Sequence, residues 1–122
     1  MKRVFAFFFC ALLAGQVWAQ TFTVGNLKYS VIEGTTNVLV AKGSAGPTGA
    51  LIIPDKVTNP NNNVEYTVTS IGEHAFGGIS GIWFITIPST VKSIGDYAFF
   101  ECIDLREINI PNSVTSIGSN AA

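Results

Sequence analysis

Apolar residues recur in a fixed order along the second half of the chain, and their spacing predicts a repeated unit of 23 residues. Ile87-Pro88 recurs as Ile110-Pro111, and the five-residue segment that begins at Val68 recurs at Val91 and again at Val114. Chance does not explain so many positions that share one period. A period of this length is typical of a solenoid, in which each repeat forms one coil stacked on the last.

The alternation of apolar and polar residues predicts a short strand in each repeat. Two successive strands have as their inward positions Ile82, Ile85 and Ile87, and then Leu105, Ile108 and Ile110. A proline follows each strand and ends its hydrogen-bonded ladder, because proline lacks an N–H. We expect equivalent residues to stack about 4.8 Å apart, as neighbouring strands do.

A second extended segment and a turn complete the predicted coil. The side chain of Ile117 and those at the equivalent position of the other repeats are expected to point from this segment into the same core. The segment ends at Gly72, Gly95 and Gly118 in successive repeats. We expect this glycine to adopt a turn conformation that a side chain would strain. Residues 96–99 are interpreted as a helical turn that buries Ala98 and Phe99.

Residues 20–50 are predicted to form a β cap that precedes the repeats. Residues 21–24 and 27–32 are expected to form a hairpin around the two-residue turn Gly25-Asn26. Residues 36–41 are another strand candidate. A solenoid needs such a cap because an open coil exposes apolar core and strand edges.

The solenoid itself is predicted to cover residues 51–122, with an irregular first repeat and a truncated last one. Residues 51–54 resemble the strand of a repeat, but Pro54 and Pro88 are 34 residues apart rather than 23. We therefore place an insertion around residues 59–63, a polar stretch that favours a surface loop.

Residues 1–19 have the features of a signal peptide. Lys2 and Arg3 are basic, residues 4–15 form an apolar run too short to span a bilayer, and residues 17–19 end in a small-residue cleavage site. We expect cleavage after Ala19. The chain is therefore predicted to be secreted or held at the cell surface, with no membrane span after cleavage.

Composition and charge narrow the function classes. The chain is 48% apolar and 12% charged with a net charge of −1, and loss of the leader takes that charge to −3. This balance does not favour nucleic acid as a partner. One histidine and two cysteines cannot supply a clustered metal site or a disulfide framework. We predict no enzyme activity, no cofactor and no metal.

The repeat resembles the BspA-like, or Treponema-type, leucine-rich repeat. The shared pattern is L-x-x-I-x-I-P-x-x-V-x-x-I-G-x-x-A-F-x-x-C, which the chain follows over residues 82–102 and 105–118. The resemblance implies a mainly β, right-handed leucine-rich-repeat solenoid with short helical turns. It also implies a secreted or surface-held bacterial adhesion module that binds a host or matrix protein or a cell-surface partner, and it carries over no catalytic residues.

The chain departs from this pattern in two places. Ile79 stands where the pattern has cysteine, and the sequence stops within a repeat at Ala122. The second departure leaves open an alternative, in which the chain is a truncated family member that acts as a structural spacer or cap of a larger surface assembly. Self-association through the open C-terminal coil is a further expectation.

One strand face is the candidate ligand-binding surface. Its residues are Trp83, Phe84 and Thr86 and, one coil further on, Arg106, Glu107 and Asn109. An outward tryptophan and phenylalanine beside an arginine have the composition of a protein-recognition hot spot. In the alternative interpretation, the insertion loop or the cap folds over these aromatic residues as additional core.

The other reactive residues are interpreted as structural. We expect His74 to be a solvated turn residue rather than a base, and Cys102 to be a small buried hydrophobe. The glycine-rich loop 43–49 lacks the Gly-Lys-Ser/Thr of a phosphate site. Four acidic residues are expected to be solvated rather than to bind calcium: Asp96, Glu101, Asp104 and Glu107.

Overall fold

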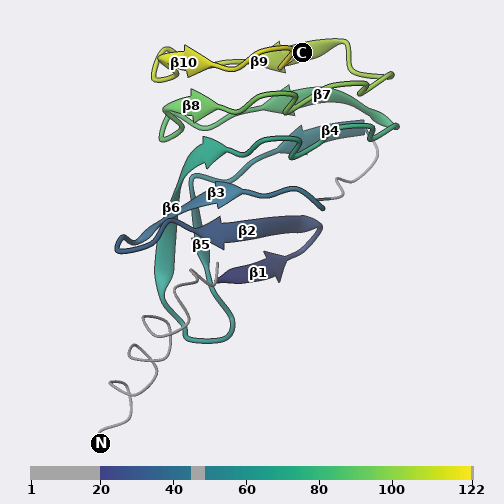
Figure 1. Ribbon diagram of the computed structural model, residues 1–122. Coiled ribbons are helices and arrows are strands. Elements are labelled where there is room, and N and C mark those ends of the chain that lie inside the picture. Colours follow the sequence, from purple (N-terminus) through teal and green to yellow (C-terminus); the bar gives the residue numbers. More distant parts are fainter. Residues whose placement is uncertain (1–19, 45–48, 122) are drawn as a thin grey trace, which may run out of the picture.

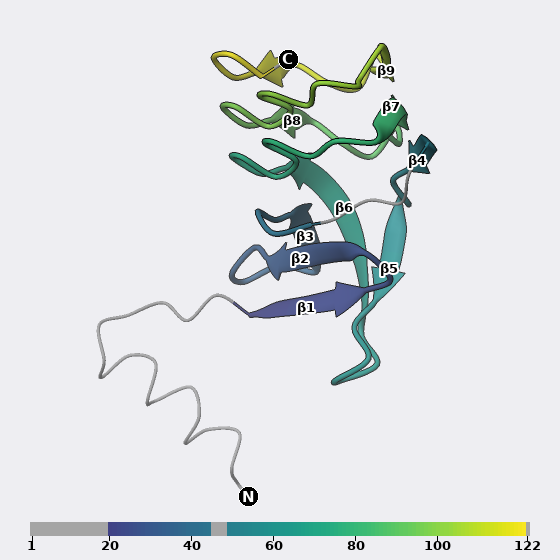
Figure 2. The same ribbon diagram turned by 90° about the vertical axis from the view of Figure 1, so that its right-hand side faces the viewer.

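The computed structural model describes residues 20–44 and 49–121, and their regular structure is entirely β. The predicted leader and the middle of the glycine-rich loop lie outside the described residues. The strands form two sheets that face each other across one core (Figures 1 and 2).

The larger sheet has seven strands and joins the N-terminal cap to the repeats. Along its path lie β1 (Thr21–Val24), β2 (Leu27–Val31), β3 (Asn37–Val40), β6 (Glu65–Ile71), β8 (Ser93–Ile94) and β10 (Ser116–Ile117), and β5 (Lys56–Thr58) pairs with β6. The smaller sheet contains β4 (Gly49–Ile52), β7 (Ile82–Thr86) and β9 (Glu107–Asn109), all parallel.

The predicted hairpin is present in the cap. Strands β1 and β2 are antiparallel, with Val24 opposite Leu27, and Gly25 has the positive φ of 63° that tight hairpin turns require. Strand β3 pairs antiparallel with β2 and parallel with β6, so one sheet runs from the cap into the repeats. The insertion forms a second hairpin, β5–β6, whose exposed tip includes Asn61.

The 23-residue repeat is confirmed as one coil of a solenoid. Strand β8 pairs in parallel with β6 on one side and β10 on the other, so that Ile71, Ile94 and Ile117 are aligned. Figure 2 shows β4, β7 and β9 stacked in one column, across the core from the column that contains β8. Each coil therefore contributes one strand to each sheet.

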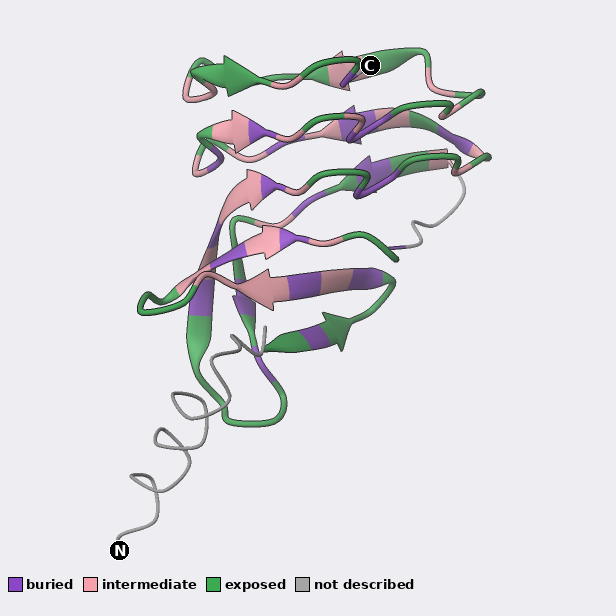
Figure 3. Ribbon diagram, in the orientation of Figure 1, coloured by how far each residue is buried: buried purple, intermediate pink, exposed green. Residues whose placement is uncertain are grey.

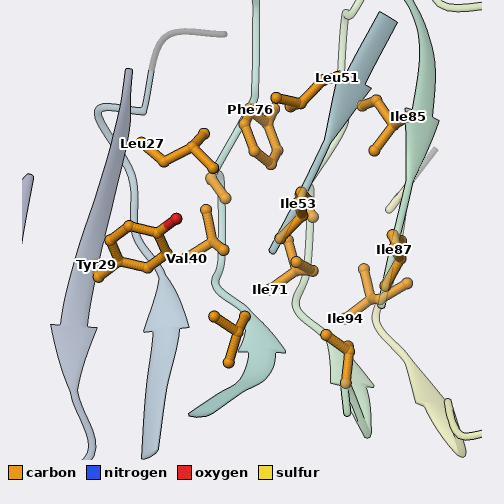
Figure 4. Packing of buried hydrophobic residues seen from close by; sticks show 14 of the residues in the cluster. Leu27, Tyr29, Val40, Leu51, Ile53, Ile71, Phe76, Ile85, Ile87 and Ile94 are labelled. Carbon is orange, nitrogen blue, oxygen red and sulfur yellow. The ribbon is translucent and has the colours of Figure 1, made fainter. Parts of the chain in front are cut away.

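The core fills the space between the two sheets. Ile82, Ile85 and Ile87 are at most 3% exposed, as the repeat pattern predicts. Figure 4 shows Ile85 and Ile87 near Leu51 and Ile53 of the preceding coil. Aromatic residues also stack from coil to coil, since the rings of Phe76 and Phe99 lie 5.7 Å apart and nearly parallel.

The predicted helical turn at residues 96–99 is wrong, although Ala98 and Phe99 are buried as expected. The segment forms reverse turns closed by hydrogen bonds from residue i+3 to residue i, such as Ala98 N to Gly95 O. The third residue of that turn, Tyr97, has φ of 58°, which a right-handed helix excludes and a type II turn requires. His74 and Asn120 adopt the same conformation in their own coils.

The role predicted for the repeat glycines is also wrong. Gly72, Gly95 and Gly118 do not have positive φ. They are instead points of close approach between coils, where a Cβ on Gly95 would lie 2.7 Å from the backbone N of Glu73. A contact that short has no room for a side chain, so glycine is required by packing rather than by its own dihedral angles.

Candidate protein-binding surface

The outer face of the three-stranded sheet is built from two rows of side chains. The register places Ala50, Phe84 and Glu107 in one row and Ile52, Thr86 and Asn109 in the next. The row between them, Leu51, Ile85 and Ile108, points into the core. Because side chains alternate across a strand, the first two rows face away from the core. We call the residues of these two rows, with Trp83 and Arg106, the docking face.

Trp83 joins this face through an irregularity in β7. The pairing of β4 with β7 shifts register after Gly49, where the bulged strand has one extra residue, Trp83. A bulge of this kind re-aims side chains and allows two neighbours to leave on the same side. Trp83 is 52% exposed, and its Nε1 lies over Gly49, whose added Cβ would meet it at 3.5 Å.

The described cap and insertion do not cover this tryptophan. The alternative in which they bury both aromatic residues therefore does not hold for Trp83, whereas Phe84 is half-buried beside it. Arg106 lies directly across the sheet, because its backbone N–H donates to the carbonyl oxygen of Trp83 at 3.0 Å. The structure thus brings all six predicted residues onto one surface.

Sequence reasoning missed two members of the docking face. Ile52 is 72% exposed and lies opposite Thr86, and Ala50 lies opposite Phe84. The signal was present in the chain: aligning Ile53-Pro54 with Ile87-Pro88 places Ile52 at the outward position of Thr86. With Ile52, the face has two large exposed apolar side chains and a rim that includes Arg106 and Glu107.

The remaining candidate residues have structural contacts. His74 is exposed and its ring stacks on Tyr97 at 5.0 Å, so its place in a turn is confirmed. Cys102 is partly buried, its Sγ lies 2.8 Å from the carbonyl oxygen of Phe76, and burial raises the pKa of its thiol. This environment disfavours the thiolate, the form of cysteine that acts as a nucleophile.

The acidic residues do not gather into one site. Asp96 and Asp104 accept hydrogen bonds from the backbone N–H groups of Ser119 and Gly81, at 2.8 Å and 2.7 Å. Both bonds join neighbouring coils. Within residues 20–44 and 49–121, no three side chains of histidine, cysteine, aspartate or glutamate come together as a metal-binding group.

Two columns of parallel strands, joined by tight turns in 23-residue coils, define a leucine-rich-repeat solenoid. Residues 55–122 match the family described as BspA type leucine rich repeat region, in six copies. The chain belongs to this BspA-type family. Its repeat domains are generally non-enzymatic and typically bind proteins. No curated protein matches the chain.

Solved structures of bacterial relatives share the fold. The chain is 31% identical to a leucine-rich repeat protein from Bacteroides capillosus ATCC 29799, with a TM-score of 0.71 and coverage of 81% of this chain and 71% of that one. A leucine rich cell surface protein from Faecalibacterium prausnitzii A2-165 is 25% identical, with a TM-score of 0.70 and coverage of 86% and 28%. A leucine-rich repeat protein from Bacteroides ovatus ATCC 8483 is 34% identical, with a TM-score of 0.65 and coverage of 77% and 24%.

The chain therefore spans most of the first relative but only 28% and 24% of the other two. No helix in the described part of the chain is long and apolar enough to cross a membrane. The comparisons and the fold together place the chain among the BspA-type leucine-rich-repeat proteins.

Proposed function

We propose that this protein is an exported, non-enzymatic adhesion module that binds another protein through the docking face. The observation that carries the proposal is Trp83, which is 52% exposed on β7; Ile52, itself 72% exposed, lies on the same outer face opposite Thr86. Exposed apolar side chains grouped with a polar rim are typical of protein-binding sites, and tryptophan and arginine are enriched among the residues that dominate binding energy.

The polar residues of the face support recognition of a protein rather than burial against the rest of the chain. Arg106, Glu107 and Asn109 are all exposed and lie on β9 or next to it. They offer donors and acceptors on one side of the exposed tryptophan. Such a rim contributes specificity and orientation, while the aromatic centre contributes most of the affinity.

The resemblance to surface adhesins favours extracellular-matrix proteins as partners, so purified matrix proteins on a biosensor surface are the direct probe. We expect Trp83→Ala to weaken binding about 30-fold, as truncation of a hot-spot residue does, and Arg106→Ala to weaken it about tenfold. Phe100→Ala is the matched control, because Phe100 is also an exposed aromatic residue but lies in a turn outside the docking face. Equal loss in all three variants, or in none, would refute this surface.

Export is tested separately. We propose that the leader directs the chain out of the cytoplasm and is removed after Ala19. The expected product begins at Gln20 and is found in the medium or on the cell surface. Mass spectrometry of the exported protein reads its N-terminus directly, and retention of residues 1–19 in the exported protein would contradict the proposal.

A further inference from the structure

The three-stranded sheet ends at β4, and the backbone of that strand alternates between a paired and an open side. The N–H groups of Gly49 and Ile53 donate to the carbonyl oxygens of Gly81 and Thr86, at 2.7 Å and 3.0 Å. Both bonds point toward β7. In parallel pairing, one residue directs its N–H and C=O to the same neighbour, and the next residue directs both groups to the opposite side.

The backbone groups of Ala50 and Ile52 therefore face away from β7. Among the described residues no strand pairs with β4 on that side. Both residues are exposed. An exposed row of unpaired donors and acceptors is a template for another extended chain.

The two sheets differ at this level of the molecule. The larger sheet continues past it through β3, β2 and β1, whereas the smaller sheet stops at β4 (Figure 2). An apolar groove of about 430 Å³ lies there. Its apolar lining comes from four strands and includes Val24, Leu27, Tyr29, Leu51 and Val57. Because Leu51 belongs to β4, the groove adjoins the open edge.

We propose that an extended segment of the bound partner adds to β4 as a fourth strand of the smaller sheet. Its backbone bonds to the open groups of Ala50 and Ile52, and one apolar side chain enters the groove. This mode of recognition takes its affinity from main-chain hydrogen bonds and its specificity from pockets for alternate side chains. The inference rests on the proposed function, since Ile52 is part of the docking face.

The lining of the groove also describes the partner segment. Side chains of an added strand alternate between the groove and the outer face, where they would lie beside Ile52. Apolar residues at every second position fit both the groove and the strand geometry. Lys56 is the single charged residue that lines the groove, so a carboxylate near the end of the segment adds complementary charge.

The probe is an acetylated and amidated heptapeptide of sequence DVTVTVD, added to the 15N-labelled protein. In the free protein we expect rapid hydrogen exchange at the amides of Ala50 and Ile52, and slower exchange at Leu51. The peptide should shift and protect the Ala50 and Ile52 amides. A peptide methylated on alternate backbone nitrogens keeps the side chains but loses donors, and we expect it to bind about fivefold more weakly.

Variants of Ile52 separate backbone from side-chain recognition. Ile52→Pro removes the open N–H but none of the hydrogen bonds between β4 and β7. It should lower the affinity for the peptide about fivefold. Ile52→Thr keeps the N–H and should weaken binding of the peptide less than Ile52→Pro does. Equal affinity for the methylated peptide overturns the proposal without requiring any variant to fold. The absence of binding at millimolar peptide also overturns it, as does protection of these amides by self-association of the free protein.

Failure of this inference and failure of the proposed function give different results. If Trp83→Ala abolishes binding to matrix protein while both peptides bind alike, the docking face stands and the fourth strand is wrong. If the peptide protects Ala50 and Ile52 while Trp83→Ala leaves matrix-protein binding unchanged, the open edge stands and the proposed surface is wrong.

Discussion

The middle coil and the last described coil have the same sequence pattern but very different burial. Ile94 is 2% exposed and its counterpart Ile117 is 55% exposed; Ile87 is 3% exposed and Ile110 is 41% exposed. Figure 3 shows the last coil largely exposed, whereas the coil beneath it contains several buried segments. The difference shows that the repeat determines which side chains point inward. Whether those side chains are buried from solvent depends on the neighbouring coil.

Contacts between coils therefore contribute most of the stability of the repeats. The hydrogen bonds that join coils are specific, as in Thr115 N to Lys92 O at 2.9 Å and Lys92 N to Thr69 O at 2.8 Å. Each coil buries its apolar face only against the next, which is the nearest-neighbour stability expected of a solenoid.

The largest effect is expected where the backbones of two coils approach too closely to admit a side chain. Gly95→Ala places a Cβ 2.7 Å from the backbone N of Glu73, and backbone atoms on both sides must separate to admit it. We expect a loss of about 3 kcal/mol or more in the free energy of unfolding, measured by urea denaturation. Gly77→Ala is the control, since its added Cβ has no neighbour closer than 3.6 Å, and it should cost less than about 0.5 kcal/mol. Similar losses in the two variants would contradict the close-packing account.

The next effect tests the comparison of the two coils directly. Ile94→Ala removes a side chain that is fully enclosed, and we expect it to cost about 2–4 kcal/mol in the free energy of unfolding. Ile117→Ala removes the aligned side chain from the exposed coil and should cost less than about 1 kcal/mol. The same denaturation experiment measures both. Equal costs would show that the last coil is covered in solution.

A smaller effect is expected at Cys102, whose Sγ contacts the carbonyl oxygen of Phe76 in the preceding coil. Burial raises the pKa of its thiol, so the reactive thiolate is depleted in the folded protein. We expect iodoacetamide to alkylate Cys102 about tenfold more slowly in the folded protein than in urea-unfolded protein at neutral pH. Cys102 is the only thiol of a chain that begins at Gln20, so the mass increase reports this site alone. Equal rates would mean that the contact with Phe76 opens readily.

The last effect concerns the cap and appears only in alkali. Burial raises the pKa of Tyr29 from 10.0 to about 12. Because the folded-state pKa is the higher one, the contribution of Tyr29 to stability is complete below pH 10 and is lost as the pH rises toward 12. Tyr29→Phe cannot ionise and should lose less stability than the unmodified protein over this interval. Parallel stability curves for the two proteins would exclude Tyr29 as a source of alkaline destabilisation.

The inward positions could be predicted from the sequence because alternation and the 23-residue period act together. Ile82, Ile85 and Ile87 were identified in this way, and the Gly25-Asn26 hairpin followed from local turn chemistry. The outward face followed from the same alternation, although Ile52 required the irregular first repeat to be aligned as well.

Features that depend on contacts between coils could not be predicted in the same way. Tyr97 has little intrinsic preference for positive φ, and it adopts that conformation because the turn is fixed between neighbouring coils by bonds such as Tyr97 N to Ser119 O. Gly95 has an ordinary dihedral angle and a neighbour that only the folded stack brings near. The outward placement of both Trp83 and Phe84 was predicted from the repeat, but the register shift that accompanies it appears only in the pairing with β4.

The central claim, that the docking face is open and binds protein, depends most on Trp83. In a chain that begins at Gln20, Trp83 is the only tryptophan, so its emission and its quenching by iodide report this surface alone. The account predicts red-shifted emission that iodide quenches readily in the folded protein and that a bound matrix protein shields. Blue-shifted emission protected from iodide in the free, folded protein would place Trp83 in a core and contradict the account.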